Sequence, residues 1–215
     1  MTADLHAEPP KALSDPEQSA AEPRLLPAFL KVAGRRVVVV GGGAVAASKL
    51  VPLLAAGAEV TVVAPRVVPE IAASPVTVLP RPFEPADLDG AWFVVAAATP
   101  EVNRQVARAA EVRRVFVNAV DDPASASAYA GGVVRRDGVV IAISTEGSAP
   151  ALAGLLRQAI DALLPADLAG WVETARGLRP RWKAAGVPLE ARRPQLLEAL
   201  NALYEQRRRD AETRE

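Results

Sequence analysis

The sequence predicts an α/β fold in which a parallel sheet is covered by helices on both faces. Short β-branched segments, such as residues 35–40 and 91–98, alternate along the chain with longer helical segments. These strands are apolar on both faces, as a sheet covered on two sides requires. The chain has 215 residues, of which 50% are hydrophobic, so it is long enough to bury a sizeable core.

The alternation extends over residues 25–127, which we expect to form one domain. Its expected strands are residues 35–40, 59–63, 76–79, 91–98 and 114–120. Its expected helices are residues 44–57, ended by Gly57, and residues 100–112. Residues 1–24 precede it, and they are rich in Pro, Ala and Glu without an apolar period, so they predict a disordered tail.

The pattern changes near residue 128. Residues 128–144 read as two strands around the turn residues Arg136-Asp137-Gly138. A helix is expected from about Ser148 to Leu163, and residues 128–164 form a segment separate from the sheet. Residues 165–215 predict a helical, arginine-rich C-terminal domain, with interruptions at Pro180, at 186–188 and at Pro194.

A glycine-rich turn joins the first strand to its helix. Gly41-Gly42-Gly43-Ala44-Val45-Ala46 fits the pattern G-x-G-x-x-G/A, directly after a buried strand and at the start of a helix, which is typical of a Rossmann-type dinucleotide site. Gly41 permits the tight turn, Gly43 lets the backbone approach a pyrophosphate, and Ala46 lets the helix pack closely on the strand. The free N–H groups of Ala44 and Val45 would then face the phosphates. The alternative is a tight turn that holds no ligand.

One part of the dinucleotide fingerprint is missing. The acid expected about 20 residues further on, at the end of the second strand, is replaced by Ala64-Pro65-Arg66. Arg66 could favour the 2′-phosphate of NADP, or could be a surface residue after a strand. Spacing alone does not decide between NAD and NADP.

Two further segments carry candidate chemistry. Asn118 and Asp121 close the fifth strand, at the edge where open α/β sheets bind their ligands, and Asp121 is a candidate proton acceptor beside the cofactor. The alternative is that Asp121-Asp122-Pro123 only forms a turn. Residues 144–150, which include Thr145, could bind an anionic group or cap the helix that follows.

Composition excludes several classes of function. The chain has no cysteine and a single histidine, His6, so thiolate metal sites, thiol nucleophiles and a hydrolytic triad are excluded, and no metal site is expected. Lys plus Arg equals Asp plus Glu at 25 each, which gives no basic field for nucleic acid or an anionic membrane. Without a signal peptide or a long apolar stretch, we expect a cytoplasmic protein.

Several segments together resemble the precorrin-2 dehydrogenase family, which also occurs as the N-terminal module of siroheme synthase. The resemblance extends from about Leu26 to Arg209. The matching segments are LPAFLKVAGRRVVVVGGGAVAASK (26–49), VTVVAP (60–65), AAAT with Asn103 after it, VNAVDDP (117–123) and ISTEGSAPALAGLLR (143–157). Departures occur at residues 128–132 and 148–149, within the part of the chain expected to face the substrate.

The resemblance implies an NAD-dependent enzyme that oxidises the tetrapyrrole precorrin-2, a substrate with eight carboxylates, to sirohydrochlorin. It implies a homodimer whose dimerisation segment corresponds to residues 128–164. Some family members also insert ferrous iron. The active-site aspartate falls on Asp121, and the residues near the substrate fall on Asn118 and Thr145. Cofactor contacts fall on Gly41, Gly42, Gly43, Ala44, Val45, Pro65, Arg66 and Thr99, and the family binds NAD without the usual acid.

Two other functions remain open from the sequence. One is a Rossmann oxidoreductase that acts on a different small substrate. The other is a non-catalytic NAD-sensing regulator, although no basic helix-turn-helix that could read DNA is visible in the chain.

Overall fold

A computed structural model describes residues 25–212, with their side chains as far as residue 205. The predicted disordered tail, residues 1–24, lies outside the described residues. The chain divides into two compact units, Met1–Lys31 and Val32–Glu215. In the first unit, residues 25–31 form no helix or strand. The second unit contains all the elements that follow.

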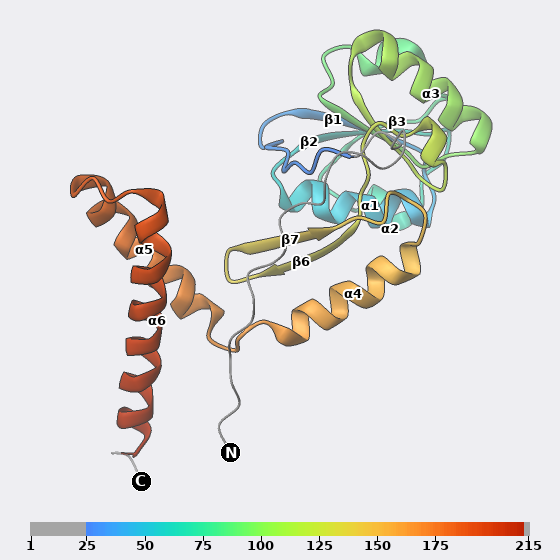
Figure 1. The fold of residues 1–215 in the computed structure, drawn as a ribbon. Coiled ribbons are helices and arrows are strands. Elements are labelled where there is room, and N and C mark those ends of the chain that lie inside the picture. The colour runs from blue at the N-terminus through green and yellow to red at the C-terminus, as the bar shows by residue number, and fades with distance from the viewer. Residues whose placement is uncertain (1–24, 213–215) are drawn as a thin grey trace, which may run out of the picture. The chain divides into compact units, whose positions relative to one another are not determined.

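The centre of this unit is a five-stranded parallel sheet with the order β3-β2-β1-β4-β5 (Figure 1). Its strands are β1 (Arg36–Val40), β2 (Glu59–Val63), β3 (Thr77–Leu79), β4 (Phe93–Ala96) and β5 (Phe116–Ala119). The chain moves outward from β1 through β2 to β3, then returns to the other side of β1 for β4. The direction of winding therefore reverses between β1 and β4, where open α/β sheets bind ligands.

Helices cover both faces of this sheet, and alternate residues of β1 supply the two cores. Val38 and Val40 pack in a core with Val106 of α3 (Pro100–Arg113). Val37 and Val39 pack in the other core with residues of α1 (Ala44–Ala55) and α2 (Pro69–Ala72). The predicted α/β fold with a parallel sheet is thus confirmed, and β2 has the predicted ends. The short helices α2, η1 (Pro85–Leu88) and η2 (Pro123–Ser125) were not predicted.

Residues 128–164 form a hairpin and a helix. Strands β6 (Gly132–Arg136) and β7 (Val139–Ile143) are antiparallel and flank a two-residue turn. Both turn residues have positive φ, 51° at Asp137 and 81° at Gly138, which suits the right-handed twist of a hairpin. Helix α4 (Pro150–Leu163) packs against β6. The Arg136 guanidinium donates hydrogen bonds to the carbonyls of Asp161 and Pro165, and so fastens the end of the hairpin to the end of α4.

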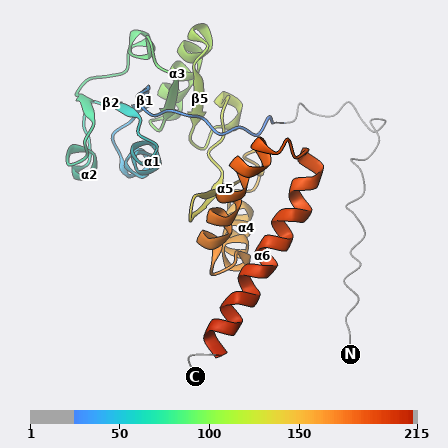
Figure 2. The ribbon, with the colours of Figure 1, turned by 90° about the vertical axis from the view of Figure 1, so that its left-hand side faces the viewer.

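The C-terminal residues form two helices, α5 (Leu168–Ala184) and α6 (Leu189–Glu212), shown from a second side in Figure 2. They pack on each other through Trp171, whose indole N–H donates to the Tyr204 hydroxyl at 2.8 Å, and through Trp182, which donates to Gln195 at 2.6 Å. The predicted break at residues 186–188 is present, with Gly186 at φ 63°.

The predicted interruptions at Pro180 and Pro194 are wrong, because both residues lie inside helices. A proline inside a helix removes one hydrogen bond and costs about 3 kcal/mol. The contacts between α5 and α6 run along both helices and can outweigh that cost. A proline in the sequence therefore ends neither helix.

A charged pair holds the loop before η1. Asp87 is buried and accepts two hydrogen bonds from the Arg81 guanidinium, at 2.9 and 2.5 Å, and one from the backbone N–H of Glu84 at 2.8 Å. Burial alone would raise the pKa of the Asp87 carboxyl, but these hydrogen bonds and the charge of Arg81 hold that pKa below its ordinary value. The pair fixes the loop that carries Pro82 and Phe83.

We expect Asp87→Asn to lower the free energy of unfolding by about 1–3 kcal/mol, because it removes the charge that pairs with Arg81 and replaces one of two acceptor oxygens at a buried position by an NH2 group, which cannot accept. A carboxyl whose pKa is lowered by folding adds stability that is present above its unfolded pKa of about 3.9 and is lost as the pH falls through the folded-state pKa. The difference between parent and variant in urea unfolding should therefore be largest near neutral pH and shrink in acid. The matched control is Glu84→Gln, at an exposed acid beside the same arginine; an equal loss of stability there would contradict this account.

Candidate cofactor and substrate site

The glycine turn after β1 is shaped by close backbone packing. Gly41 has φ 127°, and a Cβ atom at this position would overlap the carbonyl oxygen of Ala97, which follows β4. A Cβ atom at Gly42 would overlap the carbonyl oxygen of Arg66, which follows β2. The carbonyl of Gly42 accepts a hydrogen bond from the N–H of Val68 at 2.8 Å. Both glycines are therefore required by segments that lie far away in the sequence.

Gly43 differs from the other two glycines. It is the N-cap residue of α1, and a Cβ atom there would meet no atom within 4 Å. The space in front of the first turn of α1 is therefore open, and a phosphate group could approach the backbone N–H groups of Ala44 and Val45. Ala46 is fully buried in the core with Val37, as close packing of helix on strand requires. The residues present thus fit a dinucleotide.

A cavity of about 590 Å³ adjoins this turn. It is formed at the carboxyl ends of β1, β2 and β4, and it brings together six of the predicted cofactor residues: Gly41, Gly42, Gly43, Pro65, Arg66 and Thr99. Thr99 also caps α3, because its hydroxyl accepts from the N–H of Val102 at 3.5 Å. Ala44 and Val45 do not line the cavity but begin α1 next to it.

Two features of this cavity were not found from the sequence. Pro82 and Phe83 line it from the loop that Arg81 and Asp87 hold. Buried Asn103 accepts a hydrogen bond from the N–H of Ala98 at 3.0 Å, which fixes the chain after β4. Asn103 belongs to the segments that carry the family resemblance. That resemblance could have indicated that Asn103 supports the cofactor site.

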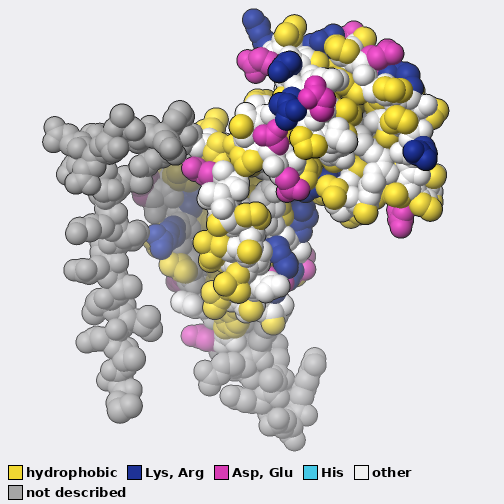
Figure 3. All heavy atoms as spheres, turned by 90° about the vertical axis from the view of Figure 1, so that its right-hand side faces the viewer, with side chains coloured by type: hydrophobic (Ala, Val, Ile, Leu, Met, Phe, Trp, Pro, Cys, Tyr) yellow, Lys and Arg dark blue, Asp and Glu magenta, His cyan; other side chains and the backbone are white. Residues whose placement is uncertain are grey.

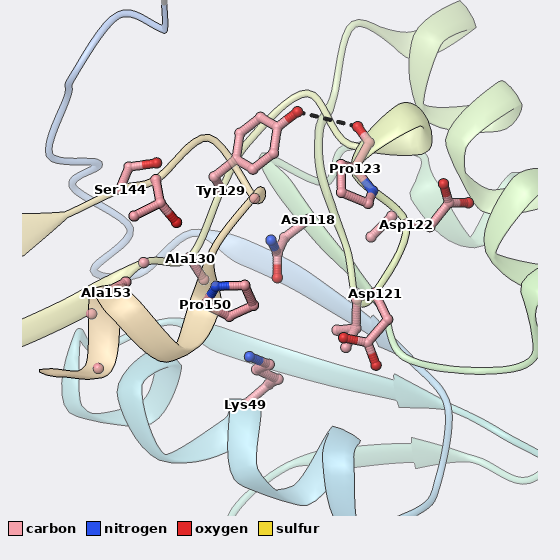
Figure 4. A pocket seen from close by; sticks show the side chains of 17 residues that line it. Lys49, Asn118, Asp121, Asp122, Pro123, Tyr129, Ala130, Ser144, Pro150 and Ala153 are labelled. Atoms are coloured by element: carbon pink, nitrogen blue, oxygen red, sulfur yellow. Dashed lines mark hydrogen bonds between the residues drawn. The ribbon is translucent and has the colours of Figure 1, made fainter.

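A second cavity, of about 380 Å³, lies at the end of β5 (Figure 4). One side is formed by Lys49 of α1 and by residues 118–123, and the other by residues 129–132, the loop after β7 and the start of α4. The predicted residues Asn118, Asp121 and Thr145 all line it. The structure thus brings together Asn118 and Thr145, which are 27 positions apart in the sequence.

The neighbouring acids Asp121 and Asp122 differ in their surroundings. Asp122 is half-buried, and its carboxylate accepts from the N–H of Ser125 at 3.3 Å, so it serves the turn. Asp121 is exposed to the cavity and has φ 56°, a conformation uncommon for residues other than glycine. Figure 4 shows the two carboxylates on different sides of the loop. Both acids line the cavity, but a turn role accounts for Asp122, whereas the Asp121 carboxylate has no hydrogen bond or ion pair among the described residues.

Asn118 and Thr145 each use part of their hydrogen-bonding capacity within the chain. Asn118 is buried and donates its amide to the carbonyl of Ala128 at 3.0 Å, which leaves its oxygen as an acceptor toward the cavity. The Thr145 hydroxyl accepts from the N–H of Ala149 at 3.2 Å, just before α4. Thr145 therefore holds the loop that leads into α4, although α4 has no side-chain cap. Its hydroxyl hydrogen can still be donated to a ligand.

Sequence reasoning assigned no role to Lys49 or Tyr129, which also line the second cavity. The Tyr129 hydroxyl donates to the carbonyl of Pro123 at 3.1 Å and braces the loop after β5 (Figure 4). Lys49 reaches the cavity from α1.

Among the residues that the structure describes, no group of three His, Cys, Asp or Glu side chains is placed to hold a metal ion. No helix within residues 25–212 is long and apolar enough to cross a membrane.

Comparisons with known proteins agree with this geometry. Residues 28–132 match a family described as putative NAD(P)-binding. The chain is 43% identical over 173 residues to siroheme synthase 1 of Aeromonas salmonicida, covering 78% of this chain and 37% of that protein. It is 44% identical over 161 residues to siroheme synthase 1 of Cronobacter sakazakii, covering 73% and 34% respectively. The chain thus spans little more than a third of the length of these relatives.

A solved structure, that of SirC, a precorrin-2 dehydrogenase, has the same fold. It aligns with a TM-score of 0.61 and 23% sequence identity over 81% of this chain and 88% of SirC. The fold and the glycine turn place the chain in the class of NAD(P)-binding α/β proteins, which supports the prediction of NAD as cofactor. Within this class, the chain belongs to the family predicted from its sequence, which the siroheme synthase relatives represent.

Proposed function

We propose that the chain catalyses the NAD-dependent oxidation of precorrin-2 to sirohydrochlorin in siroheme biosynthesis. The observation that carries this proposal is the placement of two cavities at the same edge of one sheet. The dinucleotide cavity lies at the ends of β1, β2 and β4, and the Asp121 cavity lies at the end of β5, next to β4. A cofactor and a substrate bound in them would be neighbours.

The chain's own groups would hold the cofactor through its backbone. The N–H groups of Ala44 and Val45, at the positive end of α1, would bind the pyrophosphate. Pro65 and Arg66, after β2, would lie beside the adenosine half. When bound, NAD⁺ supplies the acceptor for a hydride from the substrate.

Oxidation of precorrin-2 by two electrons releases one hydride and one proton. The Asp121 carboxylate is the group placed to take the proton or to orient the macrocycle, because it faces the cavity and the chain uses Asp122 for the turn. The Asn118 oxygen and the Thr145 hydroxyl would hydrogen-bond the substrate.

The experiment that tests this function is incubation of the purified chain with precorrin-2 and NAD⁺ while the absorption spectrum is followed. Ferrous iron added after oxidation would test the chelatase step known for some family members.

The Asp121→Asn variant should lose turnover but keep cofactor binding. The substitution keeps the shape of the side chain and removes its basicity, and loss of a positioned general base costs about 10²–10⁴-fold in rate. The pyrophosphate site is built from backbone groups at residues 41–45, so the affinity for NAD⁺ should be nearly unchanged. Initial rates of sirohydrochlorin formation and calorimetric titration with NAD⁺ measure the two effects.

The Asp122→Asn variant is the matched control for Asp121→Asn. It removes the same charge one residue away, at a carboxylate that accepts from the N–H of Ser125. Its rate should stay close to that of the parent. If Asp122→Asn were the more damaged variant, the proposed role of Asp121 would be wrong.

We expect the chain to bind NAD⁺ more tightly than NADP⁺. Arg66 lines the cofactor cavity, where it could also pair with a 2′-phosphate, but the family resemblance favours NAD. Calorimetric titrations with both dinucleotides decide this, with Arg66→Ala as the variant. If the parent bound NADP⁺ more tightly and Arg66→Ala lost that preference, the cofactor would be reassigned.

We also propose a two-fold homodimer through residues 128–164. The side chains of Leu152, Leu155 and Leu163 on α4 are 47%, 62% and 82% exposed, and Val140 of β7 is 41% exposed. Neighbouring exposed apolar side chains of this kind commonly mark an interface. The face of the molecule drawn in Figure 3 carries many hydrophobic side chains at its surface.

Light scattering at micromolar concentration should give the mass of a dimer, and Leu155→Asp should shift it toward the monomer. Val112→Asp is the matched control, because Val112 is 81% exposed but lies on α3. A parent that is monomeric, or a control that dissociates as readily as Leu155→Asp, would rule out this interface.

A further inference from the structure

The cavity at the end of β5 has an uneven distribution of charge. Three charged side chains line it: Lys49, Asp121 and Asp122. The Asp122 carboxylate already accepts a hydrogen bond from the N–H of Ser125. Lys49 is therefore the one cation among the described residues that line this cavity, and it shares the cavity with Asp121, an acid that the proposed function uses for another purpose.

The position of Lys49 is fixed by the packing of α1. Leu50, the next residue, and Ala46, one turn earlier, are both buried in the core with β1. This packing sets the rotation of the helix and directs Lys49 to the flank of α1, where it is half-buried. Figure 4 shows the Lys49 side chain at the lower border of the labelled group, below Pro150 and Asn118.

The Lys49 ammonium has no hydrogen-bond or ion-pair partner within the described part of the chain. The ion pairs found among those residues involve Arg81, Arg104, Arg113 and Arg136, and none includes Lys49 or Asp121. A cation that has lost part of its water and has no protein acceptor attracts an anionic ligand group. Since Lys49 and Asp121 form no ion pair within 4.0 Å, both charges stay available to a ligand.

We infer that Lys49 binds a carboxylate of the substrate and thereby fixes the macrocycle in front of Asp121. The inference rests on the proposed function, in which the substrate is a tetrapyrrole with eight carboxylates. One carboxylate on Lys49 orients the ring in the cavity, and the Asp121 carboxylate is left to accept a proton. Lys49 thus determines affinity and specificity for a carboxylated substrate, whereas Asp121 determines the rate.

The test compares Lys49→Met, which keeps the apolar stem and removes the charge, with Lys49→Arg, which keeps the charge. At saturating NAD⁺, Lys49→Met should raise the KM for precorrin-2 by about 10- to 100-fold, the range expected for loss of a hydrogen bond to a charged group. Its kcat should change far less, because the interaction is made equally in the ground state and the transition state. Lys49→Arg should recover most of the affinity.

Arg108→Met serves as the control for loss of one positive charge. Arg108 is exposed on α3 and lines neither cavity, so its KM should equal that of the parent. Added salt should raise the KM of the parent more than that of Lys49→Met, since it screens the ion pair. The Kd for NAD⁺ should be the same in all variants; a weaker Kd in Lys49→Met would assign this side chain to the cofactor and overturn the inference.

A binding measurement separates this inference from the proposed function. Uroporphyrin, which also carries eight carboxylates, can be titrated into the parent and Lys49→Met by fluorescence quenching, with no need for turnover. If the parent lacks dehydrogenase activity but its uroporphyrin binding depends on Lys49, the carboxylate site stands and the proposed reaction falls. If the parent oxidises precorrin-2 and Lys49→Met has the same KM, the reaction stands and the Lys49 inference is wrong. If the parent neither oxidises precorrin-2 nor binds uroporphyrin, both are wrong.

Discussion

The close contact between the turn after β1 and two neighbouring backbone segments is the constraint on which the site depends. Gly41 lies against the carbonyl of Ala97, and Gly42 lies against the carbonyl of Arg66. A side chain at either position would push apart the ends of β1, β4 and β2, which are the ends that form the dinucleotide cavity. Because Gly41 and Gly42 have no side chains, the chain segments that follow β2 and β4 can approach the turn after β1 closely. Helix α1 therefore begins close to the sheet, and the N–H groups of its first turn stay open to a phosphate.

The second cavity depends on hydrogen bonds that hold loops in unusual conformations. Asp121 and Glu146 both have positive φ, 56° and 54°, and both lie in the loops that surround this cavity. Their neighbours are held firmly: Asp122 caps η2, Tyr129 binds the carbonyl of Pro123, and the hydroxyl of Ser144 accepts from the N–H of Glu146 at 3.0 Å. Uncommon backbone conformations supported in this way concentrate at functional sites.

The sheet could be predicted from the sequence because its signals are local. The β-branched runs, the glycine turn and the alternation with helices each lie within one short segment, and β2 has the expected ends. Tertiary contacts explain what was missed. Pro180 and Pro194 are tolerated because α5 packs against α6, and the need for glycine at position 42 comes from a carbonyl 24 residues further along the chain.

The candidate site could be predicted in part for the same reason. Asn118, Asp121 and Thr145 stand in recognisable segments, and all three line one cavity. Lys49 looks in the sequence like any other lysine on a helix. Only the rotation of α1, set by Ala46 and Leu50, turns it toward the end of β5. The chain has 25 basic and 25 acidic residues, and this balance gives no sign that one lysine lines a cavity without an ion-pair partner.

The hairpin and α4 behave mechanically as one piece, since α4 packs along β6 and Arg136 fastens the far end of each to the other. This piece supplies one wall of the Asp121 cavity, through Gly131, Gly132, Ala153 and Gly154, while the parallel sheet supplies the opposite wall. A small rotation of the piece about its connection to β5 would widen or narrow the whole cavity at once. If residues 128–164 form the proposed dimer interface, the contact on the outer side of the hairpin and α4 would also set the width of this cavity, at a distance from any residue that would touch the substrate.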